Sequence, residues 1–350
     1  MRRLFLLILF SFFHFAIQAQ EAEQVFLKNG EILFEASPDL KQKNATQSDM
    51  QEIMLLDLSK GKIQRLTSDR SKDSNPSFFR NGSIIFDSKR PCEGGLAENC
   101  PSKLFTVSEG NSVDKLNLAL DDAMRRVQEE SRQDSLYSKL KKLGIQIFNS
   151  ENFSVEEPIY NNEKNYLAFI YSTPRSFLVV YNLNTDKLHY IDKIPGSSSN
   201  FKWSPNGKYL AYSYSILDGL FPKGSKNVII DIETLEVSTL ELDNEDLRFE
   251  NWSLDGKYLL LSNRFENEKG HFITDGYKLE WPTQKVQKIN ENLLPFVSSW
   301  IQIVSDNQYL VQKFDEDSNF DLWIIDSDGA DVQRLTEDGR LKFVTDTKSN

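Results

Sequence analysis

Short apolar runs separated by turn residues occupy most of the chain. The pattern is clearest in WSPNGKYLAY (203–212) and WSLDGKYLLL (252–261), which share an aromatic residue, a turn and an apolar run in the same order. Asn-Gly and Asp-Gly favour two-residue hairpin turns, because both central residues of a type I′ turn need positive φ. Similar segments begin at Leu27, Phe79, Asn161 and Val304. The pattern therefore predicts six related β-hairpins.

Two columns of side chains recur in these hairpins. Large apolar residues precede the turns at Phe26, Phe78, Tyr160, Trp203, Trp252 and Ile303. Aliphatic residues follow the turns at Leu33, Ile85, Leu167, Leu210, Leu259 and Leu310. Large aromatic rings bury much area when they pack. We therefore interpret both columns as contacts between repeated units, and the turns as scaffold and a poor place to look for function.

A second apolar run and another turn follow each hairpin, as in VIIDIETLEVSTLE (228–241). Each unit then has four strands, and repeated four-stranded units form a β-propeller. The sequence predicts an all-β fold, a six-bladed β-propeller of four-stranded blades. The expected blades span residues 24–67, 74–117, 156–192, 199–242, 248–290 and 297–337. Residues 341–350 could form a closing strand or a tail.

The connection between the second and third units, residues 118–144, lacks strand alternation. Leu120, Met124 and Val127 recur at helical spacing, which is typical of an amphipathic helix. We expect an inserted helix here. Packing of its apolar stripe on the propeller flank is favoured over a role in docking a partner.

The N-terminal residues resemble an export signal. Arg2 and Arg3 precede an apolar run over residues 4–15, and Ala19 is a small residue suited to cleavage. A membrane span needs roughly twenty apolar residues. The pattern therefore favours a cleaved signal peptide, residues 1–19, over an anchor.

The formal net charge is −11 at pH 7. An acidic protein repels nucleic acid and anionic lipid surfaces. We therefore expect no nucleic-acid partner. Since no second apolar segment approaches membrane length, we also expect no membrane span once the signal is removed.

The chain has two cysteines, Cys92 and Cys100, which flank a Gly-Gly loop. In an exported chain such a pair favours a disulfide. A metal site is less favoured, because two thiolates without a nearby histidine do not complete a tetrahedral site. A redox pair is more often spaced Cys-x-x-Cys.

The repeat resembles a known family. WSPNGKYLAYS (203–213), WSLDGKYLLLSNR (252–264) and DSNFDLWIIDSDGADVQRLT (317–336) are similar to the repeat of the TolB-like propellers, also called PD40 or WD40-like repeats. The resemblance extends from about Val25 to about Gly339. TolB has a further α/β domain before its propeller, so this chain resembles a bare propeller distinct from TolB. The resemblance implies a location in the periplasm, or secretion, in a Gram-negative bacterium.

Motifs for catalysis are missing from the sequence. It has no G-x-S-x-G nucleophile elbow, no H-E-x-x-H and no phosphate loop. His189 and His271 fall in separate predicted blades without an evident partner, so we interpret both as structural. No catalytic residue is predicted.

One acidic run, DEDSNFD, resembles half of a calcium loop. Oxygen-bearing side chains alternate at Asp315, Asp317, Asn319 and Asp321, as in loops that converge on one calcium ion. Phe320, however, occupies the place where such a loop needs glycine. An acidic loop of the repeat is favoured over a metal site, so calcium is the single cofactor considered and none is expected.

Two functions of different class remain. The favoured one is an exported, non-enzymatic binding or scaffold propeller with a protein or peptide partner. The alternative is a hydrolase or lyase that acts on carbohydrate or peptide through carboxylates at the channel mouth. The alternative predicts carboxylates from different blades with a raised pKa. We expect function where the repeats disagree, at the Cys92–Cys100 loop, the 118–143 insert and the long loop after Leu217.

Overall fold

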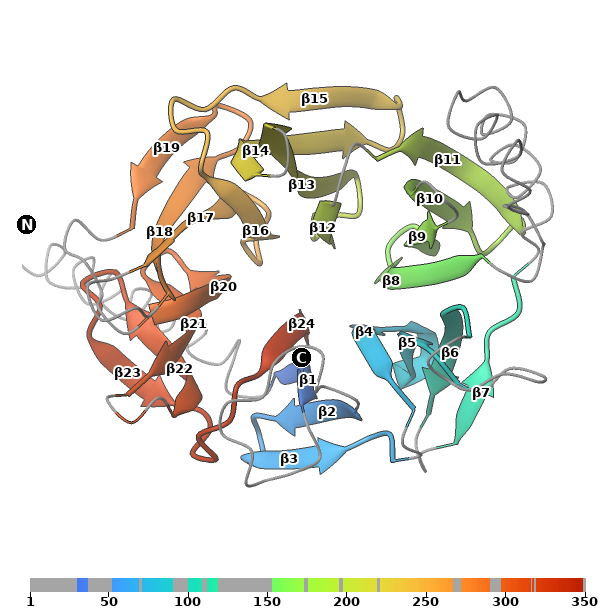
Figure 1. Ribbon diagram of the computed structural model, residues 1–350, viewed down its shortest axis with the longest axis horizontal. Coiled ribbons are helices and arrows are strands. Elements are labelled where there is room, and N and C mark those ends of the chain that lie inside the picture. Colours follow the sequence, from blue (N-terminus) through green and yellow to red (C-terminus); the bar gives the residue numbers. More distant parts are fainter. Residues whose placement is uncertain are drawn as a thin grey trace, which may run out of the picture.

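The protein is a six-bladed β-propeller. A computed structural model describes residues 30–36, 52–68, 71–90, 100–108, 112–118, 153–172, 176–194, 198–218, 221–266, 272–289, 297–315, 317 and 319–348. Six four-stranded antiparallel sheets surround a central channel (Figure 1). The predicted all-β fold and the number of blades are confirmed.

The strands of each blade, from the channel outwards, have the following bounds. The first blade contains β24 (Phe343–Lys348), β1 (Glu31–Ala36), β2 (Glu52–Asp57) and β3 (Lys62–Arg65). The second contains β4 (Asp73–Phe78), β5 (Ile84–Ser88), β6 (Lys103–Val107) and β7 (Val113–Lys115), and the third β8 (Ser154–Asn161), β9 (Tyr166–Ser172), β10 (Ser176–Asn182) and β11 (Lys187–Lys193). The fourth contains β12 (Ser198–Trp203), β13 (Tyr209–Asp218), β14 (Phe221–Asp231) and β15 (Glu236–Leu240). The fifth contains β16 (Arg248–Trp252), β17 (Tyr258–Glu266), β18 (Phe272–Glu280) and β19 (Lys285–Lys288), and the sixth β20 (Val297–Ser305), β21 (Gln308–Phe314), β22 (Phe320–Asp326) and β23 (Asp331–Arg334).

The C-terminal strand closes the ring. β24 pairs antiparallel with β1, so the first sheet combines three strands of the first unit with one from the far end of the chain. Residues 343–348 are thus a closing strand and not a tail. Asp346 lies opposite Leu33, as Trp203 lies opposite Leu210 in the fourth blade. Phe26, the expected column residue of the first blade, lies outside the described residues.

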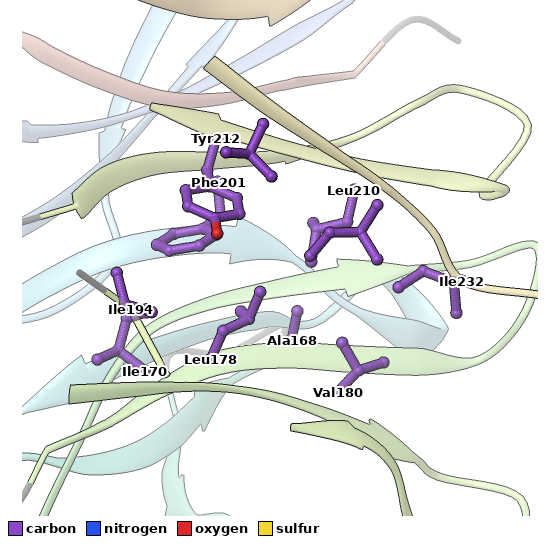
Figure 2. Close-up of a cluster of buried hydrophobic side chains, with 11 residues drawn as sticks. Ala168, Ile170, Leu178, Val180, Ile194, Phe201, Leu210, Tyr212 and Ile232 are labelled. Atoms are coloured by element: carbon purple, nitrogen blue, oxygen red, sulfur yellow. The ribbon is translucent and has the colours of Figure 1, made fainter. Parts of the chain in front are cut away.

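The aliphatic column forms the core. Leu33, Ile85, Leu167, Leu210, Leu259 and Leu310 are each 0% exposed. Between the third and fourth blades, Leu178 and Ile170 pack in one cluster with Leu210 and Tyr212 (Figure 2). The column was correctly interpreted as packing between blades.

The large apolar column also joins neighbouring blades. The indole N–H of Trp203 donates to the Ile159 carbonyl at 3.3 Å, and that of Trp252 donates to the Lys202 carbonyl at 3.3 Å. Each bond connects one innermost strand to that of the preceding blade. The predicted contact between blades is confirmed for these two residues.

The hairpin turns are of two kinds. At Asn81 and Gly82 both residues have positive φ, as the two-residue turn predicted. At the WSPNG turn, however, the Gly207 N–H donates to Ser204, and Ser204 pairs with Tyr209 across a longer loop. Gly207 has positive φ there and Asn206 does not. The two-residue type I′ prediction was therefore wrong for this turn.

Several predictions fall outside the described residues. These are the signal peptide, residues 1–19, and the 118–144 insert beyond Leu118. The long loop expected after Leu217 is instead largely strand, because β13 continues to Asp218 and β14 begins at Phe221. No helix in the described ranges is long and apolar enough to cross a membrane.

Candidate functional site: the central channel

The innermost strands surround a cavity at each end of the channel. Residues from the C-terminal parts of these strands line a common cavity, so these parts meet at one end of the channel. A cavity of about 730 Å³ at this end, the hairpin mouth, is lined by the ends of β4, β8, β12, β16 and β24 and the turns that follow. A cavity of about 320 Å³, the opposite mouth, is lined by earlier residues of the same strands, such as Glu157, Asn200 and Phe343. A smaller cavity of about 60 Å³ lies against β12, β16, β20 and β24.

Aromatic side chains form the wall of the hairpin mouth. Phe78, Tyr160, Trp203 and Trp252 line it from four consecutive blades. All four belong to the large apolar column. The rings that the sequence predicts to be contacts between blades thus also line the larger cavity.

Polar residues of the mouth form a hydrogen-bonded network. The Asp346 carboxylate accepts bonds from the Ser77 hydroxyl at 2.9 Å and the Phe78 N–H at 3.0 Å. Its other oxygen accepts from the Thr347 N–H at 2.9 Å. The Gln302 carbonyl oxygen accepts from Thr347 at 3.3 Å, and also from the Asn251 amide. The closing strand is thereby bonded to both neighbouring blades.

Lys202 borders all three cavities. Its ammonium donates a hydrogen bond to the Thr345 carbonyl, which joins β12 of the fourth blade to the closing strand of the first. Burial lowers the pKa of Lys202, and the nearby carboxylates of Asp346, Glu157 and Glu250 oppose that change. The channel therefore holds a cation near several acids.

Carboxylates bridge the blades near the opposite mouth. Glu35 accepts a bond from the Asn75 N–H at 2.6 Å, and Asp87 accepts from the Glu157 N–H at 3.0 Å. Asn75 and Glu157 both have a φ of 53° at register shifts of β4 and β8. A carboxylate of one blade thus binds the bulge of the next.

Burial raises the pKa of several of these acids. Desolvation raises the pKa of Glu35 to about 7 and that of Asp87 to about 6. It raises the pKa of Glu157 to about 8, with Asp87 as a further cause. The pKa of Glu250 rises to about 7 for the same principal reason; its carboxylate accepts bonds from Ser262 and Asn200. Glu35, Asp87 and Glu157 come from three consecutive blades, and Asp87 is a cause of the raised pKa of each of the other two. Acids from different blades thus lie near one another, as the enzyme alternative predicts, whereas Glu250 lines a different cavity.

The predicted calcium residues have separate partners. One Asp315 oxygen accepts bonds from the Asp317 N–H at 2.9 Å and the Asn319 N–H at 2.8 Å. Asp321 is buried, and it accepts bonds from Arg334 at 2.6 Å and Thr336 at 2.8 Å. Among the residues that the structure describes, no group of three or more histidine, cysteine or acidic side chains could hold a metal ion. The calcium site stays a prediction for experiment.

Cys100 and His189 line none of the three channel cavities. Cys100 is buried, but Cys92 lies outside the described residues, so their disulfide stays a prediction. His189 stacks on Tyr166 with centroids 4.6 Å apart, and its Nε2 lies 2.8 Å from the Ile232 carbonyl. These contacts support a structural role for His189; His271 is outside the described ranges.

Sequence reasoning missed the polar residues of the channel. Ser77, Ile159, Lys202, Asn251 and Gln302 each directly precede a residue of the large apolar column, and all five line the hairpin mouth. Four of the five are polar. The polar residue directly before four of these five column residues was the available signal for this position.

Comparisons with known proteins identify the fold. No model of a protein family matches the chain, and no curated protein matches it. The structure of TolB from Acinetobacter baumannii superposes with a TM-score of 0.55 and 11% identity, over 92% of this chain and 65% of that one. The structure of putative TolB from Agrobacterium tumefaciens gives 0.51 and 11%, over 92% of this chain and 98% of that one. The β-propeller domain of the Trilobed protease from Pyrococcus furiosus gives 0.47 and 13%, over 85% and 78%.

The chain therefore shares the six-bladed propeller fold of the TolB structures. It is distant from TolB itself, since identity to both TolB structures is 11%. This confirms the resemblance of the repeat. The chain spans 65% of the length of the A. baumannii protein. A structural similarity of this kind indicates the fold, and the activity has to be inferred from the residues of the site.

Proposed function

We propose that this protein is an exported binding propeller that takes a segment of a protein or peptide partner into the hairpin mouth. The supporting observation is the cavity of about 730 Å³ lined by aromatic rings from four blades. Binding sites are commonly concave, with apolar and aromatic walls and a few placed polar groups. The TolB fold and the expected signal peptide are consistent with such a role in the cell envelope.

Site-specific crosslinking tests this proposal. A photoreactive residue replaces Asn162, which is exposed and lines the mouth, or Val332, which is 49% exposed on the outer strand β23. In envelope fractions we expect one protein to be crosslinked from position 162 and not from position 332. Leu254→Arg, which introduces a long charged chain into the mouth, should abolish that crosslink. Equal crosslinking from both positions, or none from 162, contradicts the proposal.

A second candidate rests on the acids of the opposite mouth. Glu157 and Glu35 line a cavity of about 320 Å³ and have pKa values raised to about 8 and about 7. A carboxyl that keeps its proton near neutral pH can act as a general acid. Purified protein would be incubated with polysaccharide and peptide panels, and new reducing ends, unsaturated sugars or new amino termini measured. Products absent with Glu157→Gln support this candidate, whereas no turnover of any substrate by the unmodified protein removes it.

A further inference from the structure

The polar side chains of the hairpin mouth form most of their hydrogen bonds within the protein. Both Asp346 oxygens are occupied, by Ser77, the Phe78 N–H and the Thr347 N–H. The Gln302 amide donates to the Trp252 carbonyl and accepts from Asn251. These groups hold the closing strand in place and have little capacity left for a ligand.

Lys202 differs from these residues. An ammonium group has three N–H donors. Within the described part of the chain, Lys202 donates to a single acceptor, the Thr345 carbonyl. The same side chain borders the hairpin mouth and the two other cavities. It can therefore offer a further charged donor to a group that enters the mouth.

The second lysine of the mouth is placed differently. Lys348 forms an ion pair with Glu31 at 3.7 Å and lies over the Phe78 ring at 5.6 Å. Its charge thus already has a carboxylate partner at the rim. Lys348 and Lys202 thus line the same cavity but have different partners. Lys348 is paired with a carboxylate, whereas Lys202 is bonded to a backbone carbonyl.

The acids near Lys202 repel an incoming anion only weakly. Burial raises the pKa of Glu157 to about 8 and that of Glu250 to about 7, so near neutral pH Glu157 is mainly protonated and Glu250 is partly so. Neither then opposes an incoming anion with a full charge. The Asp346 oxygens, in turn, are directed to three donors of the protein.

The side chains that line the hairpin mouth determine which chemical group can lie next to the anion. The rings of Phe78, Trp203 and Trp252 surround the cavity that Lys202 borders. A ligand that reaches the ammonium from the hairpin mouth can contact this aromatic surface, which favours an apolar or aromatic group next to the charge.

We propose that the Lys202 ammonium is the anchor for a carboxylate that the partner presents beside an apolar or aromatic group at the hairpin mouth. The inference rests on the proposed function, because it assigns the chemistry of the segment that enters the same cavity. A peptide chain end with an apolar last residue has this chemistry, as does an acidic side chain beside an aromatic residue. A charge-assisted hydrogen bond to the ammonium fixes the orientation of the segment.

A small aromatic carboxylate tests the anchor without the partner. Saturation-transfer NMR would measure binding of 3-phenylpropionate to the full protein, with 3-phenylpropionamide as the neutral analogue. We expect the carboxylate to bind the unmodified protein and the control Lys285→Met, which changes an exposed lysine of the outer strand β19. With Lys202→Met, and with the amide, affinity should fall on the order of tenfold or more, since hydrogen bonds to charged groups are strong. Lys202→Arg, which keeps the charge, should retain part of the binding.

Two results overturn the proposal. One is equal binding of 3-phenylpropionate to the unmodified protein and to folded Lys202→Met, with folding checked by circular dichroism. The other is no binding of 3-phenylpropionate to the unmodified protein. A partner crosslinked at position 162 together with either result would retain the proposed function and remove the carboxylate anchor. If carboxylate binding depends on Lys202 but no partner is crosslinked at position 162, the anchor is retained and the proposed function is removed.

Discussion

The Asp346 carboxylate lies 2.9 Å from the Ser77 hydroxyl, although 269 residues separate the two. The same carboxylate oxygen accepts the Phe78 N–H. The closing strand is therefore bonded to the second blade by a side chain as well as to β1 by its backbone. This contact joins the two ends of the ring in addition to strand pairing.

Asp346→Ala should weaken the attachment of the closing strand β24 to the ring. The change leaves the Phe78 N–H and the Ser77 hydroxyl without their acceptor, and an unsatisfied buried donor costs about 1–3 kcal/mol. Hydrogen exchange should become faster in β24 and β1 than in the other blades. Asp328→Ala, at an exposed turn position, is the control and should leave exchange unchanged. Uniformly faster exchange in all six blades would contradict a local role.

Stability should decrease as the pH rises from about 5 to about 8. The pKa values of Glu35, Asp87, Glu157 and Glu250 are raised in the folded protein, so the folded state binds more protons than the unfolded state in this window. The free energy of unfolding then falls with increasing pH. Thermal melts at pH 6 and pH 8.5 should give a lower Tm at the higher pH.

Glu157→Gln should reduce this dependence on pH. Glutamine keeps the shape of Glu157 but carries no charge, so the Tm of the variant should exceed that of the unmodified protein at pH 8.5 by several degrees, on the scale of roughly a few kcal/mol. At pH 6 the two should differ less. Glu163→Gln, at an exposed position of the same blade, is the control. An unchanged pH profile for Glu157→Gln would show that this group does not contribute.

Gly276→Ala should destabilise the contact between the fifth and sixth blades. A Cβ at Gly276 would lie 2.4 Å from Cε2 of Trp300, which is 2% exposed and donates to the Thr274 carbonyl at 2.9 Å. Overpacking of this kind costs about 1–3 kcal/mol. Chemical denaturation would measure the loss. The double variant Gly276→Ala/Trp300→Leu removes the ring, so the alanine should cost much less in that background; equal costs in both backgrounds would refute the packing explanation.

Calcium should not stabilise the protein. The oxygens of Asp315 accept bonds from its own loop, and Asp321 is bonded to Arg334 and Thr336. A ligand that binds only the folded state stabilises it, by an amount that increases with ligand concentration, and so raises the Tm. Melts with millimolar calcium and with a chelator should therefore coincide. A rise with calcium that Asp315→Asn removes would establish the site instead.

The fold could be predicted because its sequence pattern is repeated in every unit. The residues of the channel differ between units, so no repeated pattern indicated them. Leu33, Leu210 and their counterparts are aliphatic in all six units because each occupies the same buried position. The residues directly before the large apolar column differ from blade to blade, for example Lys202 and Gln302, since each bonds to different partners. A search for uniform columns therefore finds packing and passes over these residues.

Ring closure could not be derived from the sequence for a related reason. The segment FVTDTK (343–348) has no turn and no second strand beside it in the chain. Its partner β1 begins at Glu31, and its column position holds Asp346 where the other units have large apolar residues. Neither pattern nor spacing connects segments so far apart.

The position of β24 also sets the order in which the protein can fold. The contact between the Thr345 hydroxyl and the Leu33 carbonyl spans 312 residues, whereas each of the other blades can form from consecutive residues. Contacts between distant segments are costly to form early, because a long loop must close first. Blades two to six can therefore assemble while the first still lacks its innermost strand. In that order of assembly the hairpin mouth, which Asp346 and Thr347 line in part, would be completed only when β24 pairs with β1.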